Sequence, residues 1–369
     1  MRAGGMLAFP KPSMKHPASI PPLLRHGSWL LLAAVLGFAP ALPGAQAAQP
    51  PTKKFEVRGE RSYLDGHEIK LWGIRGGNVL MSPAVTERFV RNLDNMAAHG
   101  INGLILVVSG TNTGWPDEWL ARSGFESDGR LKTAFAQRLE WIIREADRRG
   151  MVIGVTILSP RTDQDLDGEA GIKGAIQATG RLLVERGLRN VFVDLCHEYN
   201  HERIDQELLR EPDGAAKKAR MARWLKEVAP DIPVGACPTI DTGSAPDFPG
   251  ADIQIIQKRM PIPAKGYVIN VEMHKRDNYD SEGVFTEAGF KQMYEWFDGY
   301  LKAPNAGFFL HSSFIMGVTG RDGTGPHAEM GGYGKSADDR GVRFYYEWVR
   351  DNVGRWEFPR HVKAGQGSP

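Results

Sequence analysis

The chain has 369 residues, a length that fits one large α/β barrel or at most two ordinary domains. Hydrophobic residues make up 41% and charged residues 24%, which are ordinary globular values and exclude a disordered chain, a collagen and a coiled coil. Two cysteines exclude a disulfide scaffold and a multi-cysteine zinc cluster, and a formal net charge of +2 is not that of a nucleic-acid-binding protein.

Residues 1–47 have the pattern of a secretory signal peptide. Basic side chains and no acidic ones precede the apolar run 29–39, and the small-residue site Ala45-Gln46-Ala47 follows it. The alternative is an uncleaved membrane anchor, but an eleven-residue helix rises only about 16 Å against a bilayer core of about 30 Å. We therefore expect removal of 1–47 and a periplasmic or extracellular protein.

Removal of this segment changes the charge of the chain. The four basic residues of 1–47 leave with it, so 42 of the 46 basic residues face 44 acidic ones and the mature charge is −2. No polyanionic partner is implied, and no later apolar stretch reaches the 18 residues of a membrane span. An oxidising compartment permits a disulfide between Cys196 and Cys237, although two buried thiols are the preferred interpretation.

Beyond the leader, expected strands and helices alternate along the chain. A β-ribbon is expected over 55–72, with Asp65-Gly66 as a hairpin turn. Eight apolar strands are expected at 71–77, 101–110, 151–160, 190–198, 233–240, 251–258, 267–273 and 306–314. Amphipathic helices are expected at 84–99, 132–149, 170–186, 215–228, 287–302 and 341–353.

This order predicts an α/β fold, a (β/α)₈ TIM barrel with a short N-terminal β-ribbon, as a single domain over 48–369. Apolar strands without alternation are typical of a parallel sheet that is buried on both faces, and eight strand–helix units complete a barrel. A doubly wound open sheet is the alternative. Its phosphate-binding turn requires G-x-G-x-x-G, and Gly73, Gly76 and Gly77 do not have that spacing.

A TIM barrel places its active site at the carboxyl ends of the strands, so residues at strand ends become candidates. Glu198 and Glu272 follow the fourth and seventh strands, and two carboxylates across a cleft are the minimum requirement for glycoside hydrolysis. The other candidates, all for substrate binding, are Arg75, Asn78, His197, Tyr199, Asn200, Arg259, His274, His311 and, on the loop after the second strand, Trp115.

The fourth strand carries a family resemblance. NVFVDLCHEYN (190–200) resembles the strand-four signature of the clan A glycoside hydrolases, particularly family 5, in which an acidic residue lies four positions before the catalytic glutamate. LWGIRGGN (71–78), HGINGLILV (99–107) and YVINVEM (267–273) resemble the first, second and seventh strands of that family. The resemblance implies that Glu198 is the acid/base and Glu272 the nucleophile of a retaining enzyme.

The chain also departs from the family pattern. Ile105 stands where family 5 usually has a strand-two arginine, and Arg75 is the expected substitute. The usual strand-three histidine and strand-eight tryptophan are missing, and Tyr199 replaces the proline after the acid/base. We expect an ionised Glu272 held by Arg75 or Arg259, with His197 orienting it or binding a substrate hydroxyl.

Two other functions compete for the same residues. His197-Glu198-Tyr199-Asn200-His201 matches the H-E-x-x-H zinc-protease motif, which requires a helix and a third ligand such as Glu227. A non-catalytic carbohydrate-binding barrel is the second alternative, because a fold alone does not imply activity.

The predicted function is a secreted glycoside hydrolase that acts on a carbohydrate. It needs no metal or organic cofactor, and it has no nucleic-acid partner and no membrane span after leader removal. The Gly-rich segment 317–341 follows the eighth strand and is expected to cover the active-site face. The sequence does not specify the sugar, the linkage or the oligomeric state.

Overall fold

The structure is a computed structural model that describes residues 49–111, 123–160, 165–201, 214–239, 247–273, 284–316 and 326–362. The chain divides into two units, Met1–Ala47 and Ala48–Pro369. The fold below is that of the second unit. The predicted signal peptide lies outside the described residues, and within the described part no helix combines the length and apolarity needed to cross a bilayer.

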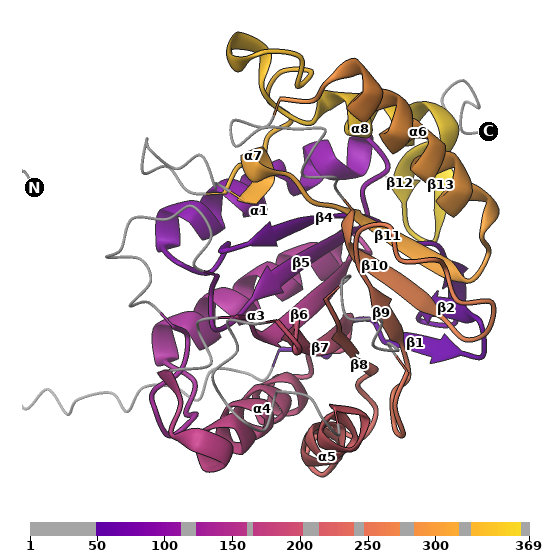
Figure 1. Ribbon diagram of the computed structural model, residues 1–369. Helices are drawn as coiled ribbons and strands as arrows, with labels where there is room; N and C mark the ends of the chain where they lie inside the picture. The colour runs from indigo at the N-terminus through magenta and orange to yellow at the C-terminus, as the bar shows by residue number, and fades with distance from the viewer. Residues whose placement is uncertain are drawn as a thin grey trace, which may run out of the picture. The chain divides into compact units, whose positions relative to one another are not determined.

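Eight parallel strands form the centre of the second unit (Figure 1). They are β4 (Trp72–Gly77), β5 (Gly103–Val107), β6 (Val152–Leu158), β7 (Val191–His197), β8 (Val234–Cys237), β9 (Gln254–Ile256), β10 (Val268–Met273) and β11 (Ala306–Leu310). Their order is β8-β7-β6-β5-β4-β11-β10-β9. The Val234 carbonyl on β8 accepts bonds from the amides of Asp252 and Ile253, at 2.8 and 3.2 Å, just before β9. The sheet thus nearly closes into the predicted barrel, and the open-sheet alternative is wrong.

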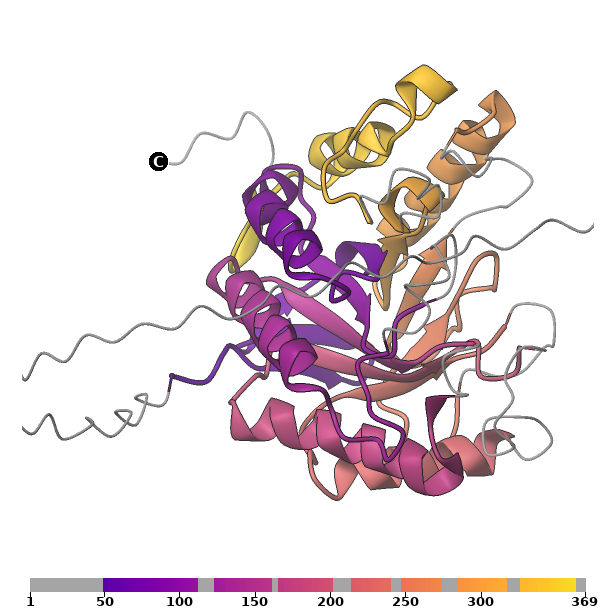
Figure 2. The same cartoon turned by 90° about the vertical axis from the view of Figure 1, so that its left-hand side faces the viewer.

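Helices cover the outside of the sheet, as the two views of Figures 1 and 2 show. They are α1 (Pro83–Ala98), α3 (Thr133–Arg148), α4 (Gly168–Glu185), α5 (Gly214–Lys226), α6 (Glu287–Lys302), α7 (Ser313–Met316) and α8 (Arg343–Asn352). Apart from the single turn α7, each lies within two residues of a predicted helix. Side-chain caps define two of the starts, because the Ser82 and Thr286 hydroxyls accept amide hydrogen bonds from Val85 and Gly289.

Two phenylalanine rings fill the interior of the barrel. Phe192 and Phe309 are completely buried, with ring centroids 6.2 Å apart. Glycines on neighbouring strands make room for them. A Cβ atom at Gly154 would lie 2.5 Å from Phe192 Cζ, and one at Gly103 would lie 2.8 Å from Phe309 Cε1. The interior is therefore a packed core, and any cleft has to lie above it at the strand ends.

The N-terminal ribbon closes the amino-terminal end of the barrel. It comprises β1 (Phe55–Arg58), β2 (Arg61–Leu64) and β3 (His67–Ile69), all antiparallel. Asp65 and Gly66 form the predicted two-residue turn, with φ of 46° and 78°. Phe55 packs against Phe192, with ring centroids 6.1 Å apart, so the ribbon also covers the floor of the interior.

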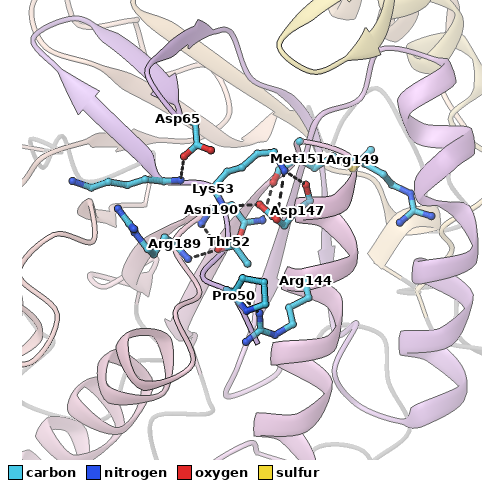
Figure 3. Close-up of polar contacts among 12 residues, drawn as sticks. Pro50, Thr52, Lys53, Asp65, Arg144, Asp147, Arg149, Met151, Arg189 and Asn190 are labelled. Atoms are coloured by element: carbon cyan, nitrogen blue, oxygen red, sulfur yellow. Dashed lines mark hydrogen bonds and ion pairs between the residues drawn. The ribbon is translucent and has the colours of Figure 1, made fainter. Parts of the chain in front are cut away.

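Hydrogen bonds fix the chain that enters this ribbon (Figure 3). The Thr52 hydroxyl accepts from the amides of Arg189 and Asn190, at 2.6 and 3.2 Å, immediately before β7. The Lys53 amide donates to Asp147 Oδ1 at the end of α3, at 2.8 Å. The first described residues are thus bonded to two barrel units that lie far from them in the sequence.

A short C-terminal hairpin, β12 (Arg355–Glu357) and β13 (Arg360–Val362), was not predicted. It lies at the same end of the barrel as the ribbon. The Trp356 indole N–H donates to the Arg149 carbonyl before β6, at 2.9 Å, and His361 Nε2 lies 3.0 Å from the Gly100 carbonyl before β5. Both ends of the described chain therefore stabilise the face opposite the candidate site.

The glycine–phenylalanine packing makes a stability prediction. Gly154→Ala places a methyl group against the Phe192 ring and should lower the free energy of unfolding by about 1–3 kcal/mol, as overpacking does. Phe192→Leu in the same chain should recover part of the loss. Gly299→Ala on α6 is the matched control, because its Cβ would meet nothing within 4 Å and alanine favours a helix. Urea unfolding measures all three, and equal stabilities of Gly154→Ala and Gly299→Ala would contradict the packing argument.

Candidate active site

The carboxyl ends of β7 and β10 bring two glutamates together that are 74 positions apart in the sequence. Glu198 follows β7 directly, and Glu272 lies near the end of β10. One oxygen of each carboxylate and a ring nitrogen of His197 all lie within 4.8 Å of one another. The pairing predicted for Glu198 and Glu272 is thus present at the end of the barrel where TIM-barrel sites form.

Glu272 is buried and surrounded by cationic or potentially cationic groups. Arg75 Nη1 donates to Glu272 Oε2, and His197 Nε2 lies 2.9 Å from the same oxygen. Burial acts to raise the pKa of Glu272, but the charges of His311 and Arg75 and the hydrogen bond from His197 outweigh it and hold that pKa well below its ordinary value. Glu272 is therefore ionised at neutral pH. Arg75 is one of the two cations expected to hold it.

His197 connects the groups around Glu272. Its Nε2 atom lies 2.9 Å from Arg75 Nη1 and 2.9 Å from Glu272 Oε2. In the neutral ring this nitrogen accepts from Arg75 or donates to Glu272, depending on the tautomer. Its Nδ1 atom is buried and has no hydrogen-bond partner among the described residues. His197 can therefore orient Glu272, which is one of its two predicted roles.

Irregular strand pairing aims these side chains into one site. The register of β4 against β5 shifts between Arg75 and Gly77, and that of β7 against β8 shifts between Asp194 and His197. A third shift lies between Asn270 and Met273, on β10 against β11. β-Bulges re-aim side chains and are over-represented next to active sites. Each of the three strands that supply Arg75, His197 and Glu272 has one.

Glu198 has a backbone conformation that is uncommon for its residue type. Its φ is +52°, in the left-handed region, and Lys258 after β9 has a φ of +50°. Lys258 Nζ lies 3.6 Å from Glu198 Oε1. Among the described non-glycine residues only Asp65, in the hairpin turn, shares this conformation. Two strained residues thus face each other at the candidate site, which is where such strain tends to concentrate.

Below the glutamates lies a buried carboxyl, Asp194. Its Oδ2 atom accepts from the Thr156 hydroxyl at 3.0 Å, and its Oδ1 atom accepts from the Cys237 amide at 3.1 Å. Burial raises the pKa of Asp194 despite the nearby charges of His197 and Arg75. These bonds fix β7 to its neighbours on both sides, directly under the site.

The two cysteines are not joined in a disulfide. Cys196 and Cys237 are both buried, and burial raises the pKa of Cys237 well above its ordinary value. The structure thus has the buried thiols that the sequence favoured and not the disulfide. The Cys237 thiol therefore lacks the thiolate character of a nucleophile.

Two of the residues predicted to bind substrate, Asn78 and Asn200, form hydrogen bonds to other protein groups. Asn78 has no exposed surface, and its amide bonds the backbone and hydroxyl of Thr111. The Asn200 oxygen accepts from the amide and hydroxyl of Thr239, at 2.6 and 3.0 Å. Asn78 and Asn200 therefore tie the loops above the strands together.

The three other described candidates differ in exposure. Tyr199 is 1% exposed and lies under the ammonium group of Lys218, 3.5 Å from the ring centroid, so its ring faces protein and not solvent. Arg259 is exposed after β9, and Lys258, not Arg259, contacts a site carboxylate. His311 is buried at the end of β11, and its charge acts on Glu272. Trp115 and His274 lie outside the described residues.

Lys258 is the site residue that sequence reasoning missed. Arg259 is the candidate that the sequence suggests after the sixth strand, and its neighbour Lys258 is not among the candidates. The left-handed backbone of Lys258 ends the alternation, so Lys258 contacts Glu198 while Arg259 is exposed. A glycine, asparagine or aspartate would have signalled such a conformation, and lysine does not.

The helix that a zinc protease requires is absent from the described 197–201 segment. His197 ends a strand, and Glu198–Asn200 form a turn. Glu227, the suggested third ligand, accepts a hydrogen bond from Gln177 of α4 at 2.9 Å, on the outer helical layer. The His197, Glu198 and Glu272 group has the donor atoms of a metal site, but the Arg75 guanidinium already contacts two of its members. The helix on which the zinc-protease alternative depends is therefore not formed by these residues, and that alternative is wrong.

Part of the Gly-rich segment 317–341 is described, from residue 326 onward. His327 stacks on Phe314 of α7, with ring centroids 4.3 Å apart. The hydrogen bond from His327 to Glu329, opposed by partial burial, lowers the pKa of Glu329 to about 2, and Arg88 of α1 adds to the effect. This part of the segment is therefore fixed to the elements that follow β4 and β11.

The fold is that of known glycoside hydrolases. No protein-family model and no curated protein matches the sequence. Among solved structures, a family 5 glycoside hydrolase from Bacteroides vulgatus is similar over 82% of this chain and 69% of its own, with 15% identity and a TM-score of 0.51. A proposed glycoside hydrolase from the same organism is similar over 82% of this chain and 61% of its own, with 15% identity and a TM-score of 0.56. An endocellulase from Pyrococcus horikoshii, in complex with cellotetraose, is similar over 82% of this chain and 99% of its own, with 12% identity and a TM-score of 0.51. The resemblance expected from the sequence is thus confirmed for the fold.

The charge around Glu272 makes a pH-dependent prediction. Because the pKa of Glu272 is lower in the folded than in the unfolded chain, its ionisation stabilises the fold at neutral pH, and this contribution is lost as pH falls below about 4.3, the ordinary value for glutamate. Glu272→Gln should cost about 3 kcal/mol at pH 7, because Arg75 is left buried without its partner. In urea unfolding, the difference in the free energy of unfolding between Glu272→Gln and the wild type should become smaller as the pH falls from 5 to 3.

Glu60→Gln is the control for this experiment, because Glu60 is exposed on the ribbon. It should change stability little at any pH. A Glu272→Gln protein as stable as the wild type at pH 7 would contradict an ionised, cation-held Glu272.

Proposed function

We propose that this protein is an exported glycoside hydrolase that cleaves an O-glycosidic bond with retention of configuration. Glu272 is the nucleophile and Glu198 the general acid and base. The observation that carries the proposal is the pair of carboxylates at the carboxyl end of a TIM barrel, with oxygens within 4.8 Å of each other. The carboxyl groups of retaining enzymes are about 5–5.5 Å apart, whereas inverting enzymes need about 6.5–9.5 Å to admit a water molecule.

The environments of the two carboxylates differ in the way that this chemistry needs. Glu272 is buried and ionised, with Arg75 and His197 fixing the oxygen that they share, so it is suited to attack. Glu198 is partly exposed, and its cationic contact within the described part of the chain is Lys258, at 3.6 Å. It can therefore give its proton to the leaving oxygen in the first step and take a proton from the attacking water in the second.

The first step forms a glycosyl-enzyme. A Glu272 oxygen attacks the anomeric carbon, the bond from that carbon to the glycosidic oxygen breaks, and the leaving oxygen takes the proton of Glu198. In the second step a water oxygen attacks the same carbon and gives its proton to Glu198, while the bond to Glu272 breaks. No redox or metal step is needed to balance the reaction.

Two further features support the proposal. The structural neighbours include an endocellulase in complex with cellotetraose, which suggests β-linked glucans as the first substrates to assay. The basic and apolar pattern of 1–47 supports export, so a polymeric substrate outside the cell would be accessible.

Substitution of the two glutamates tests the roles separately. Glu272→Ala should abolish hydrolysis of both cellotetraose and aryl β-glycosides, because no nucleophile is left. Glu198→Ala should lose about 10²–10⁴-fold on cellotetraose, the usual contribution of general acid catalysis, and much less on 2,4-dinitrophenyl glycosides, whose leaving group needs no proton. NMR of the first-formed product should show the anomer of the substrate.

Full activity of Glu272→Ala would exclude its role as nucleophile, and an inverted product would exclude retention. Sugar binding by the wild type without turnover, across a panel of gluco-, manno- and galactosides, would favour the carbohydrate-binding alternative.

Chelation tests metal dependence. Dialysis against EDTA should leave glycosidase activity unchanged, because Arg75 and His197, and not a metal ion, contact the carboxylate of Glu272. A loss of activity that zinc restores would contradict the two-glutamate mechanism and favour a metal at His197, Glu198 and Glu272.

A further inference from the structure

We infer that Asn270 is a positioning residue, which holds the irregular part of β10 that turns the nucleophile Glu272 toward the site. The inference rests on the proposed function, which it deepens by adding a residue that the first chemical step needs. It depends on the hydrogen bonds of one buried side-chain amide and on the strand register around it.

Asn270 lies on the outer face of β10. Its partner on β11 is Phe308, which precedes the interior residue Phe309, and successive strand residues point to opposite faces. The Phe308 ring packs against Tyr300 of α6, with ring centroids 5.0 Å apart. Asn270 has no exposed surface, and its Nδ2 atom donates to the hydroxyl of the same tyrosine at 2.8 Å. The Asn270 side chain is thus directed toward α6 and acts on the site only through other residues.

Regular strand alternation would direct Glu272 outward as well, because it lies two residues after Asn270 on the same strand. Its carboxylate instead contacts Arg75 of β4 and His197 of β7, and neither of those strands is adjacent to β10. The pairing of β10 with β11 changes register between Asn270 and Met273. This bulge reverses the direction of Glu272, so the position of the nucleophile depends on what holds the bulge in place.

The Asn270 amide holds the bulge through two backbone bonds. Its Oδ1 atom accepts from the Glu272 amide at 3.1 Å, and its Nδ2 atom donates to the Lys258 carbonyl at 3.0 Å. The Lys258 amide donates to the Glu272 carbonyl at 2.7 Å, which closes a ring of hydrogen bonds. The regular pairing of β9 with β10 ends at Ile256 and Asn270, so this ring continues the contact between the two strands beyond their ladder. Glu272 is therefore fixed at both its amide and its carbonyl.

Tyr300 fixes the orientation of the Asn270 amide. The Lys258 carbonyl and the Tyr300 hydroxyl give each of the two Nδ2 protons an acceptor. A reversed amide would direct its NH₂ group at the N–H of Glu272 and its oxygen at the Lys258 carbonyl. Because the group is buried, those mismatched contacts would be costly, and one orientation is strongly favoured.

Loss of the Asn270 amide should therefore impair the attack by Glu272 and not the binding of the sugar. Attack requires reacting atoms that are aligned and about 3–3.5 Å apart, and a displacement of about 1 Å can lower the rate about 10²-fold. Groups that bind the sugar from other strands keep their positions, so ground-state binding should be preserved.

The test is hydrolysis, by the full-length protein, of the 2,4-dinitrophenyl glycoside of the sugar that the wild type cleaves best. The leaving group departs without a proton, so kcat/KM reports the attack of Glu272 and not the acid function of Glu198. Asn270→Leu removes the amide at similar volume and should lower this kcat/KM about 10²-fold. The inhibition constant of the free sugar, which measures ground-state binding, should change by less than about threefold.

Asn305→Leu is the matched control. Asn305 is also buried, and its Nδ2 atom donates to the carbonyls of Pro263 and Gly266, both at 3.0 Å. It resembles Asn270 in residue type, burial and number of backbone bonds, but it lies just before β11, at the amino end of the barrel. Asn305→Leu should lose stability in urea unfolding, as Asn270→Leu does, and should keep the wild-type kcat/KM.

A folded Asn270→Leu protein with the wild-type kcat/KM overturns the inference while the proposed function stands. A loss of kcat/KM that Asn305→Leu shares also overturns it, because the loss then follows from stability alone. A rise of the inhibition constant that matches the loss of kcat/KM would place Asn270 in sugar binding and overturn it as well.

If Asn270→Leu does not fold, Asn270→Ala removes the same bonds with a smaller side chain and gives the same comparison. A wild type that cleaves no glycoside of the panel overturns the proposed function and the inference together.

Discussion

The candidate site depends on keeping one carboxylate ionised at the top of a dry barrel. Burial of Glu272 disfavours its charge, and only groups brought by other strands can offset this. Arg75 comes from β4, His197 from β7 and His311 from β11, so three strands converge on a residue of a fourth. A closed barrel makes this convergence possible, because the carboxyl ends of all its strands surround one point.

The barrel has two levels with different requirements. In the interior, Phe192 and Phe309 pack against glycines, and regular strand geometry suffices. At the level above, register shifts in β4, β7 and β10 turn Arg75, His197 and Glu272 toward one another. The irregular level rests on the regular one through Asp194, whose carboxyl bonds Thr156 on β6 and Cys237 on β8. The interior layer of the strands therefore stabilises the barrel, and the layer above it forms the candidate site.

This division explains what the sequence could predict. The strands were predictable because apolar runs such as 101–110 and 151–160 are long and end at glycine or proline, and the fold follows from their number and order. The proximity of Glu198, Glu272, Arg75 and His197 was predictable because a barrel brings its strand ends together at one face. Lys258 was not, because its inward direction comes from a left-handed backbone, which a lysine does not signal. The binding roles expected of Asn78 and Tyr199 came from proximity to strand ends, and proximity does not show that Asn78 bonds Thr111 or that Tyr199 is covered by Lys218.

The surroundings of the glutamates show which part of a site a fold constrains. The family 5 pattern has an arginine on the second strand, where this chain has Ile105, yet an arginine still contacts the glutamate, from the first strand. Adjacent barrel strands are about 5 Å apart, a distance that a long guanidinium side chain can span. The requirement is therefore a positive charge at one point above the barrel, and the strand that supplies it can change. The same reasoning applies to Lys258, which brings a cation to Glu198 from a strand end where residue type alone gave no reason to expect it.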